Sequence, residues 1–255
     1  MTSPIKVWLE AGGRLLRLRL ARPKANLIDA AMIAALDAAL VQHLPEPTLS
    51  GVLLDAEGTN FSFGASVEEH LPRQCATMLS SLHRLIGRML ESPVPLLVAV
   101  HGRCLGGGLE VALAGHLLFV SPSAELGQPE MKLGVFAPAA SCLLPALVGP
   151  QHALDLLISG RSISGSEAVS LGIAAAAADA PENAALSYFN EHLLPKSARS
   201  LRYAVQSARF DYVDRVRTKL ATLERLYLEE LMQTHDAVEG LTAFIEKRPA
   251  LWEHR

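Results

Sequence analysis

One short segment limits more than any other what this chain can fold into: an apolar run followed closely by three consecutive glycines. Residues 96–100 (LLVAV) have the length and composition of a buried strand, and residues 106–108 are all glycine. A helix that begins at such glycines presents unpaired N–H groups, and the positive end of its dipole, to whatever lies in front of it. The segment therefore predicts a strand–helix unit with a site for an anion, or for an oxygen that becomes anionic, at the helix start.

Two glutamates lie where they can act beside such a site. Glu110 falls in the first turn of the expected helix, and Glu130 follows Pro129 on an expected loop. Alone, the first can be a helix-terminal charge and the second an exposed ion-pair partner. Together, two carboxylates can take a proton from water and deliver a proton to carbon. With an oxyanion site nearby, they predict an enzyme that adds water to an activated double bond.

A second loop of small residues supplies the other half of the expected oxyanion site. Gly64 and Ala65 follow the apolar run at 51–55, which we interpret as another buried strand. Because loops at the carboxyl ends of parallel strands meet at one edge of a sheet, the N–H groups of Ala65 and Gly107 are expected to converge on one carbonyl oxygen. The structural alternative is that the glycines only allow close packing of a helix on a strand.

Composition excludes several classes of function. The 255 residues are 50% hydrophobic, which is enough for one large core, and the net charge is −3. This charge balance provides no positive electrostatic potential that would attract nucleic acid, and the 5% aromatic content argues against stacking on nucleic-acid bases. Basic residues cluster at 14–24 and 196–209, and we interpret both clusters as exposed strand and helix faces rather than polyanion sites.

Cysteines, histidines and hydropathy add further limits. Cys75, Cys104 and Cys142 are too widely spaced for a disulfide framework or a CxxC metal site, and the histidines show no metal-ligand spacing. No leader is apparent, and no apolar run approaches the roughly 18 residues that span a bilayer. We expect a cytoplasmic protein without metal.

The order of the expected elements predicts an α/β fold with a helical C-terminal region. Strands at 5–20, 51–55, 96–100 and 117–120 alternate with helices, one of them capped by Asp29 and running to about residue 40, and one at 73–90. After about residue 139 only helical patterns follow, at 139–148, 150–159, 164–171, 181–193, 196–209, 212–234 and 236–247.

The glycine and glutamate segments resemble the two signature segments of the enoyl-CoA hydratase/isomerase (crotonase) superfamily. Four further segments are similar to the family in the expected order: the CoA-binding loop at 22–26, the first oxyanion loop at 63–66, the region from 160 to 173, and the C-terminal helix at 243–248. The resemblance implies a crotonase-like spiral of ββα turns at 1–190 and a helical trimerisation region at 191–255.

The resemblance also implies roles for single residues. Ala65 and Gly107 would bind the thioester oxygen, and Glu110 and Glu130 match the two glutamates that hydratases of the family use. Lys24 and Ala25 belong to the CoA-binding loop, and Lys247 would reach the CoA phosphates from a neighbouring subunit. Coenzyme A is part of the substrate, and no metal or other cofactor is implied. Homotrimers or dimers of trimers, without nucleic-acid or membrane partners, are expected.

Two loops depart from the more usual family pattern and bear on the substrate. Ser66 stands where many relatives have Asp, and residues 135–142 (VFAPAASC) replace a glycine-rich loop. Both loops look most like the branch that hydrates cyclohexa-1,5-diene-1-carbonyl-CoA in anaerobic benzoyl-CoA breakdown, where water can add at the far end of the diene as a formal 1,4-addition. The alternatives are a straight-chain 2-enoyl-CoA hydratase, or a non-catalytic acyl-CoA-binding or RNA-binding relative.

Overall fold

A computed structural model describes residues 3–255, and two sheets organise it. The larger sheet has the strand order β1-β2-β3-β4-β6-β9, and the smaller has β5-β7-β8. Only the pairs β1–β2 and β7–β8 are antiparallel. The strands are β1 (Ile5–Glu10), β2 (Leu15–Leu20), β3 (Gly51–Ala56), β4 (Leu96–Val100), β5 (Arg103–Leu105), β6 (Leu117–Val120), β7 (Glu125–Gly127), β8 (Ser162–Ser164) and β9 (Ala176–Ala177).

Successive turns of the chain visit both sheets and then form a helix. One turn runs through β4, β5 and α3 (Gly107–Leu113), and the next through β6, β7 and α4 (Pro138–Ser159). In the turn before them, the smaller-sheet strand is reduced to one bridge between Ser62 and Cys104, and α2 (Cys75–Leu90) follows. The predicted α/β spiral of ββα turns is confirmed.

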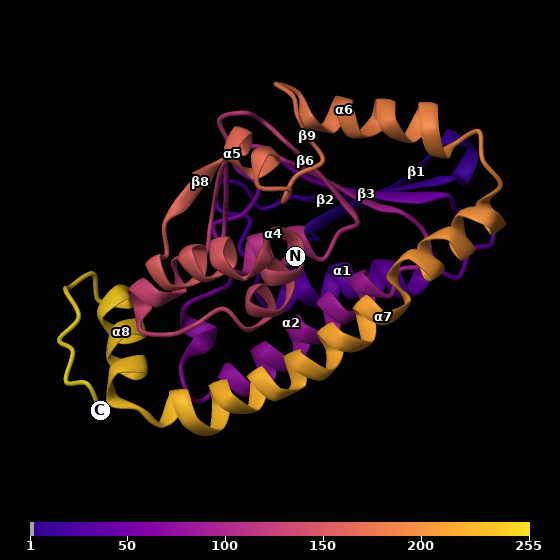
Figure 1. Cartoon of the computed structure of the whole chain (residues 1–255). Coiled ribbons are helices and arrows are strands. Elements are labelled where there is room, and N and C mark those ends of the chain that lie inside the picture. Colours follow the sequence, from indigo (N-terminus) through magenta and orange to yellow (C-terminus); the bar gives the residue numbers. More distant parts are fainter. Residues whose placement is uncertain (1–2) are drawn as a thin grey trace.

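Alternating side chains of the large sheet enter two separate apolar layers. Leu96, Val98 and Val100 of β4 join the main core, which also contains residues of α1 (Ala30–His43) and α2. Leu97 and Ala99 point to the other face, which α6 (Pro181–Tyr188) covers (Figure 1). This period of two, with both faces apolar, is typical of a parallel sheet buried between helices.

Most predicted elements are confirmed. The pair β1–β2 forms the expected hairpin, and the carboxylate of Asp29 accepts a hydrogen bond from the Met32 N–H at 2.9 Å, as a helix N-cap does. The remaining helices are α5 (Gly165–Ser170), α7 (Ala198–Arg225) and α8 (His235–Ile245). The helical region from α7 onward runs along one side of the molecule (Figure 1). The division into units at about residue 190 stays a prediction.

One predicted helix boundary is wrong and another is confirmed. The helices expected at 196–209 and 212–234 are one long helix, α7, which ends at Arg225 and continues as a π turn, Leu226–Glu230. No glycine or proline interrupts this stretch, so nothing stops the helix. The predicted break between the helices at 139–148 and 150–159 is confirmed: within α4, Gly149 leaves the helical conformation with φ 76° and ψ 168°, and the chain kinks there.

α4 also corrects the expectation about apolar runs. By length and composition alone, α4 is apolar enough to cross a membrane. Its N-terminal half is nevertheless packed in the main core through Ala139, Ala140, Leu143 and Leu144, and it carries two internal prolines. Its C-terminal half is more exposed, with Leu154 and Ile158 on the surface.

The first basic cluster is not a simple exposed face. Arg17 of β2 is buried, with 2% of its surface exposed, and its Nη2 lies 2.6 Å from Asp55 Oδ2 on the neighbouring strand β3. Arg19 bonds the other oxygen of Asp55. The expectation that these basic residues form an exposed strand face is wrong. The alternating pattern of β2 does not show that the neighbouring strand β3 carries a buried carboxylate.

Candidate functional site

A cavity of about 560 Å³ lies where the glycine segment, the Ala65 loop and both glutamates meet. Its walls are mostly apolar and come from α2, from the segment after Glu130 and from α8. The predicted residues Ala65, Gly107, Glu110 and Glu130 all line it, together with Leu79, Leu82, Leu133, Phe136, Leu241 and Phe244. The fold therefore gathers four positions that span 66 residues of sequence into one enclosed space.

Ala65 and Gly107 lie side by side at one end of this cavity. A Cβ atom on Gly107 would lie 3.0 Å from the Ala65 Cβ and 3.1 Å from the Ala65 nitrogen, so only glycine allows this approach. Gly107 is the first residue of α3, so its N–H has no acceptor within the helix. Among residues 3–255, neither N–H donates a hydrogen bond to the protein. Two free N–H groups thus lie close together beside the cavity.

The Ala65 loop is fixed by its neighbours. The Gly64 carbonyl accepts a hydrogen bond from the Ile28 N–H at 3.0 Å, and the Phe63 N–H donates to the Ala25 carbonyl at 2.9 Å. The Ser62 hydroxyl accepts from the Gly64 N–H at 3.1 Å. These bonds hold the loop rigid without using the Ala65 N–H.

Glu130 packs against the glycine segment from the following spiral turn. It lies in a 3₁₀ turn, Pro129–Leu133, and not on the irregular loop that we expected. Gly106 adopts φ 49° and ψ −129°, and a Cβ there would lie 2.7 Å from Glu130 Oε1. With its amide nitrogen facing the carboxylate, the buried Gln128 donates to both Glu130 oxygens at 3.0 Å.

Glu110 is held by the start of another helix. Its side chain is buried, with 4% exposed, and Oε1 accepts a hydrogen bond from the Ala140 N–H at 2.9 Å. Ala140 is in the first turn of α4, so the positive end of that helix dipole faces the carboxylate. This placement favours the ionised form of Glu110.

Burial shifts both carboxyl groups away from their ordinary pKa. Loss of solvent raises the pKa of Glu110, while the N–H groups of Ala140 and Ala139 and the nearby His83 act in the opposite direction. Loss of solvent, and then the charge of Glu110, raise the pKa of Glu130 to about 8. Glu130 has some exposed surface, but that surface faces an apolar cavity rather than bulk water. Glu130 therefore holds a proton at neutral pH, and the pKa of its partner Glu110 is also raised, although the contacts of Glu110 with α4 offset part of that shift.

Sequence reasoning missed two polar residues of the site. His70 lines the cavity, although it was expected on the surface or in the core. Its Nδ1 lies 2.8 Å from the Ser66 carbonyl, so Nδ1 carries the proton and Nε2 is left as an acceptor; burial lowers the pKa of this ring. Gln128 was part of the segment that precedes Glu130, and no role was predicted for its side chain. For His70, the sequence did contain a signal: it follows Ser66 by four residues, about one helical turn, so the two residues could be expected to lie close together.

The predicted CoA-binding residues do not line the cavity. Lys24 is exposed on the loop whose Ala25 carbonyl holds the Phe63 N–H, so this loop adjoins the Ala65 loop. Lys247 is exposed just beyond the end of α8, whose Leu241 and Phe244 close the cavity. Among the described residues, no group of His, Cys, Asp and Glu side chains is arranged to hold a metal ion.

Comparisons with known proteins agree with this geometry. A family model described as enoyl-CoA hydratase/isomerase matches residues 10–255. The chain is 65% identical over 254 residues to the cyclohexa-1,5-dienecarbonyl-CoA hydratase of Thauera aromatica, covering 100% of this chain and 98% of the relative. It is 31% identical to a probable enoyl-CoA hydratase of Bacillus subtilis, covering 91% of this chain and 92% of that protein. The prediction of an enzyme of the enoyl-CoA hydratase type, a hydro-lyase, is confirmed.

Solved structures show the same fold. An enoyl-CoA hydratase/isomerase from Pseudoalteromonas atlantica superposes with a TM-score of 0.84 at 26% identity, covering 98% of this chain and 99% of that one. An enoyl-CoA hydratase from Mycobacterium avium subsp. paratuberculosis gives a TM-score of 0.85 at 21% identity, covering 99% of both chains. The full-length sequence matches and the shared spiral lead to one conclusion: this chain belongs to the enoyl-CoA hydratase/isomerase family.

Proposed function

We propose that this protein adds water to cyclohexa-1,5-diene-1-carbonyl-CoA, as a step in anaerobic benzoyl-CoA breakdown. The observation that carries the substrate is the 65% identity over the full chain to a relative named for this activity. The cavity supports it, because its apolar walls suit a hydrocarbon ring and both glutamates face the same space.

The oxyanion site is proposed to polarise the thioester. The N–H groups of Ala65 and Gly107 bind the carbonyl oxygen and hold the negative charge that moves onto it when water adds. Each such donor stabilises the charge by roughly 3–4 kcal/mol in favourable cases. Since both N–H groups are already free and fixed, no reorganisation is needed when the charge develops.

The two glutamates are proposed to divide the proton transfers. Glu110, the carboxylate facing the start of α4, takes a proton from water as the water oxygen bonds to one end of the diene. Glu130, which holds a proton at neutral pH, delivers it to carbon at the other end. One double bond is left in the ring. The proton gained by Glu110 then passes to Glu130, which restores both groups.

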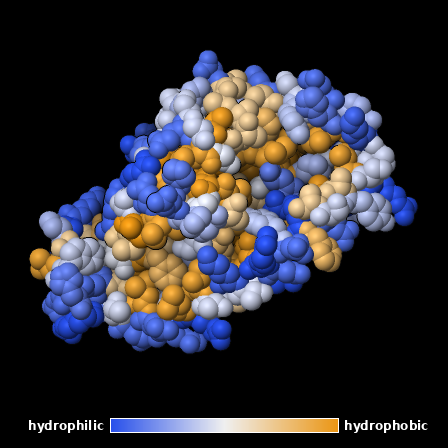
Figure 2. Space-filling view, viewed as in Figure 1, coloured by the Kyte–Doolittle hydropathy of each residue, from blue (hydrophilic) through white to orange (hydrophobic). Residues whose placement is uncertain are grey.

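The surroundings are proposed to hold the rest of the substrate. Lys24 and the Ala25 loop contact the CoA phosphates, Lys247 reaches them from a neighbouring subunit, and no further cofactor takes part. We also propose a homotrimer or a dimer of trimers. α4 exposes the apolar side chains of Leu147, Leu154 and Ile158, and Figure 2 shows apolar side chains gathered on the face of the molecule around α4. Sedimentation analysis tests the assembly.

Turnover of cyclohexa-1,5-diene-1-carbonyl-CoA beside crotonyl-CoA tests the substrate. Fast hydration of the diene with little turnover of crotonyl-CoA is the expected result. The second candidate, a straight-chain 2-enoyl-CoA hydratase, is favoured by the Bacillus subtilis relative. Fast turnover of crotonyl-CoA with none of the diene would establish that candidate and overturn the proposal.

A further inference from the structure

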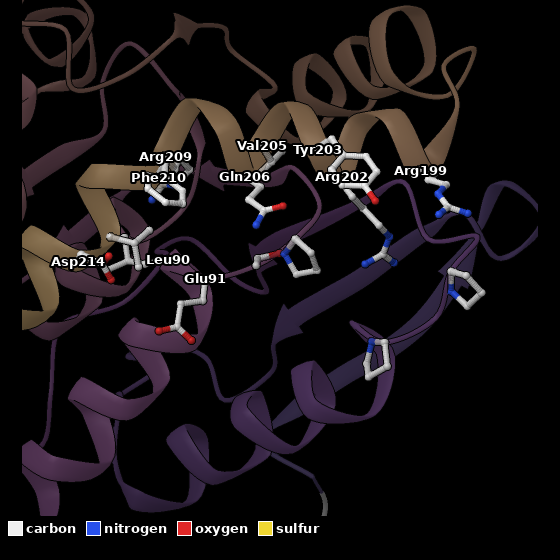
Figure 3. Close-up of a pocket in the computed structure, with 15 residues that line it drawn as sticks. Leu90, Glu91, Arg199, Arg202, Tyr203, Val205, Gln206, Arg209, Phe210 and Asp214 are labelled. Carbon is white, nitrogen blue, oxygen red and sulfur yellow. The ribbon is translucent and has the colours of Figure 1, made fainter.

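A second cavity lies under the N-terminal half of α7, away from the glutamates. Its volume is about 720 Å³, and none of its lining residues belongs to the Glu110–Glu130 cavity. α7 forms one wall, and the end of α2 with the segments before β3 and β4 forms the other (Figure 3). It is therefore a separate space, and its role does not depend on the proposed reaction.

Three arginines of α7 line this cavity without a carboxylate partner. Arg199, Arg202 and Arg209 are three and seven residues apart, which places them on one face of the helix. Figure 3 shows Arg199 and Arg202 below the helix, on its cavity side. Within residues 3–255, no Asp or Glu oxygen lies within 4.0 Å of any of the three guanidinium groups. In the second basic cluster, Lys196 and Arg199 are exposed as expected, while Arg202 and Arg209 are partly buried.

The acidic residues of the cavity wall are already occupied. Glu91 pairs with Arg217, and Asp214 Oδ1 lies 3.7 Å from Arg217 Nη1. Arg202 donates through Nη1 to the Leu44 carbonyl at 3.2 Å and through Nη2 to the Glu46 carbonyl, and both acceptors are neutral. Glu46 is close enough to act on the pKa of Arg202, whereas no Asp or Glu acts on that of Arg209, so Arg209 is the arginine whose charge lacks a local counter-charge.

The polar groups without partners are all donors. Nε and Nη2 of Arg209 and Nε of Arg202 are buried and have no hydrogen-bond acceptor among the described residues. His116 lies near Arg209 but does not line the cavity; burial, and then the charge of Arg209, lower the pKa of its ring, so it supplies no counter-charge. Burial lowers the pKa of Arg209. A ligand that satisfies this set must bring acceptors and negative charge.

The remaining wall is apolar. Leu90 and Pro93 face Val213 and Phe210 of α7, and Phe210 leaves 69% of its surface exposed. The Arg209 guanidinium rests over the Tyr212 ring at 5.0 Å, which holds it in place. A bare inorganic anion satisfies the donors but leaves these walls uncovered. An anion with an apolar body covers both.

We propose that this cavity binds a small organic carboxylate. Its carboxylate accepts hydrogen bonds from the Arg209 guanidinium, in the planar geometry that the two groups share. Its apolar body packs between Phe210 and Val213 on one side and Leu90 and Pro93 on the other.

Calorimetric titration of the full chain in a phosphate-free buffer tests the site. Cyclohexanecarboxylate and octanoate are the probes, and cyclohexanecarboxamide is the uncharged control of the same shape. The carboxylates are expected to bind and the carboxamide is not. Arg209→Met should weaken carboxylate binding by about tenfold or more. Arg215→Met, which removes an exposed arginine of the same helix outside the cavity, should leave it unchanged.

Three results would overturn the proposal. One is equal binding of the carboxylates by Arg209→Met and by the unchanged protein, or no binding by either. A second is binding of inorganic phosphate with no binding of the carboxylates. A third is a change in the sedimenting mass of Arg209→Met without carboxylate binding, because the arginine would then contact another copy of the chain. Thermal unfolding confirms that each variant is folded.

Discussion

The two cavities place charged side chains in similar apolar surroundings, yet those surroundings have opposite consequences. Burial raises the pKa of Glu110 and Glu130 and lowers that of Arg209, because in each case it disfavours the charged form. A carboxyl group can take up a proton near neutral pH and so store it. A guanidinium keeps its charge at any such pH and can only be satisfied by a counter-ion. The same desolvation thus makes one cavity suited to proton transfer and the other to anion binding.

Removal of either carboxylate tests the first half of this comparison most severely. Glu110→Gln and Glu130→Gln should each lower turnover by about 10²–10⁴-fold, because an amide neither takes nor delivers the proton. Affinity for a non-reacting CoA ester should be retained. Steady-state kinetics and calorimetry measure the two effects, and Glu229→Gln, an exposed glutamate, is the control. Near-normal turnover in both site variants would end the two-carboxylate scheme.

Two arginine variants test the part of the comparison that concerns buried guanidinium groups, because one arginine has a carboxylate partner and the other does not. Arg17→Met leaves the buried Asp55 with Arg19 as its remaining partner, and the loss of one charged hydrogen bond should lower the free energy of unfolding by about 1.5–3 kcal/mol. Arg209→Met removes an unpaired guanidinium and should leave stability unchanged or raise it. Urea unfolding of both variants measures the contrast. Equal destabilisation would show that Arg209 has a partner in solution.

A methyl group at the oxyanion site tests how closely the two loops must approach. Gly107→Ala places a Cβ 3.0 Å from the Ala65 Cβ, which forces the two N–H groups apart. Loss of one well-placed donor lowers kcat by about 10²–10³-fold. KM should change much less. Gly87→Ala is the matched control, since a Cβ there meets nothing within 4 Å. An equal effect of both substitutions would contradict the proposed role.

The smallest expected effect is a dependence on pH that only the carboxyl cavity gives. If Glu130 delivers a proton, kcat/KM for hydration should fall about tenfold per unit above pH 8, where it ionises. In the folded protein, the Glu130 carboxyl keeps its proton up to about pH 8. In the unfolded chain, the same carboxyl loses its proton around its ordinary pKa of 4.5. The free energy of unfolding should therefore decrease as pH rises from 4.5 to about 8.

Glu130→Gln serves as the control for this pH dependence. It should remove that part of the slope and be more stable than the unchanged protein at high pH. A slope that is the same in both proteins would show that another group causes it. Arg209→Met should leave the slope unaltered.

Much of the fold follows from the sequence because its main strands are strongly patterned. The runs in β3 and β4 are apolar on both faces, and Asp29 caps its helix with a residue suited to that place. The strands β5, β7, β8 and β9 were missed, since two or three residues are too few to show a period. These short strands form because they pair with strands of neighbouring spiral turns, not because their residues have a strong β propensity.

The site divides in the same way. Ala65, Gly107, Glu110 and Glu130 were found because their chemistry requires particular residue types in a recognisable order. Gln128 and the cavity under α7 were not predicted. Their properties depend on which side chains lack partners, and this is decided by contacts between segments far apart in the chain.

The spiral has a consequence for how an enzyme of this kind can change. Ala65 and Gly107 come from successive turns joined by the Ser62–Cys104 bridge, so their separation is fixed by the scaffold. The side chains that surround an acyl group come instead from peripheral pieces, with Leu82 on α2, Phe136 after Glu130 and Phe244 on α8. These pieces are interchangeable without touching the bridge. The oxyanion site and the side chains around the acyl group therefore belong to different parts of the fold. Substitutions around the acyl group can change the substrate while the oxyanion site stays the same.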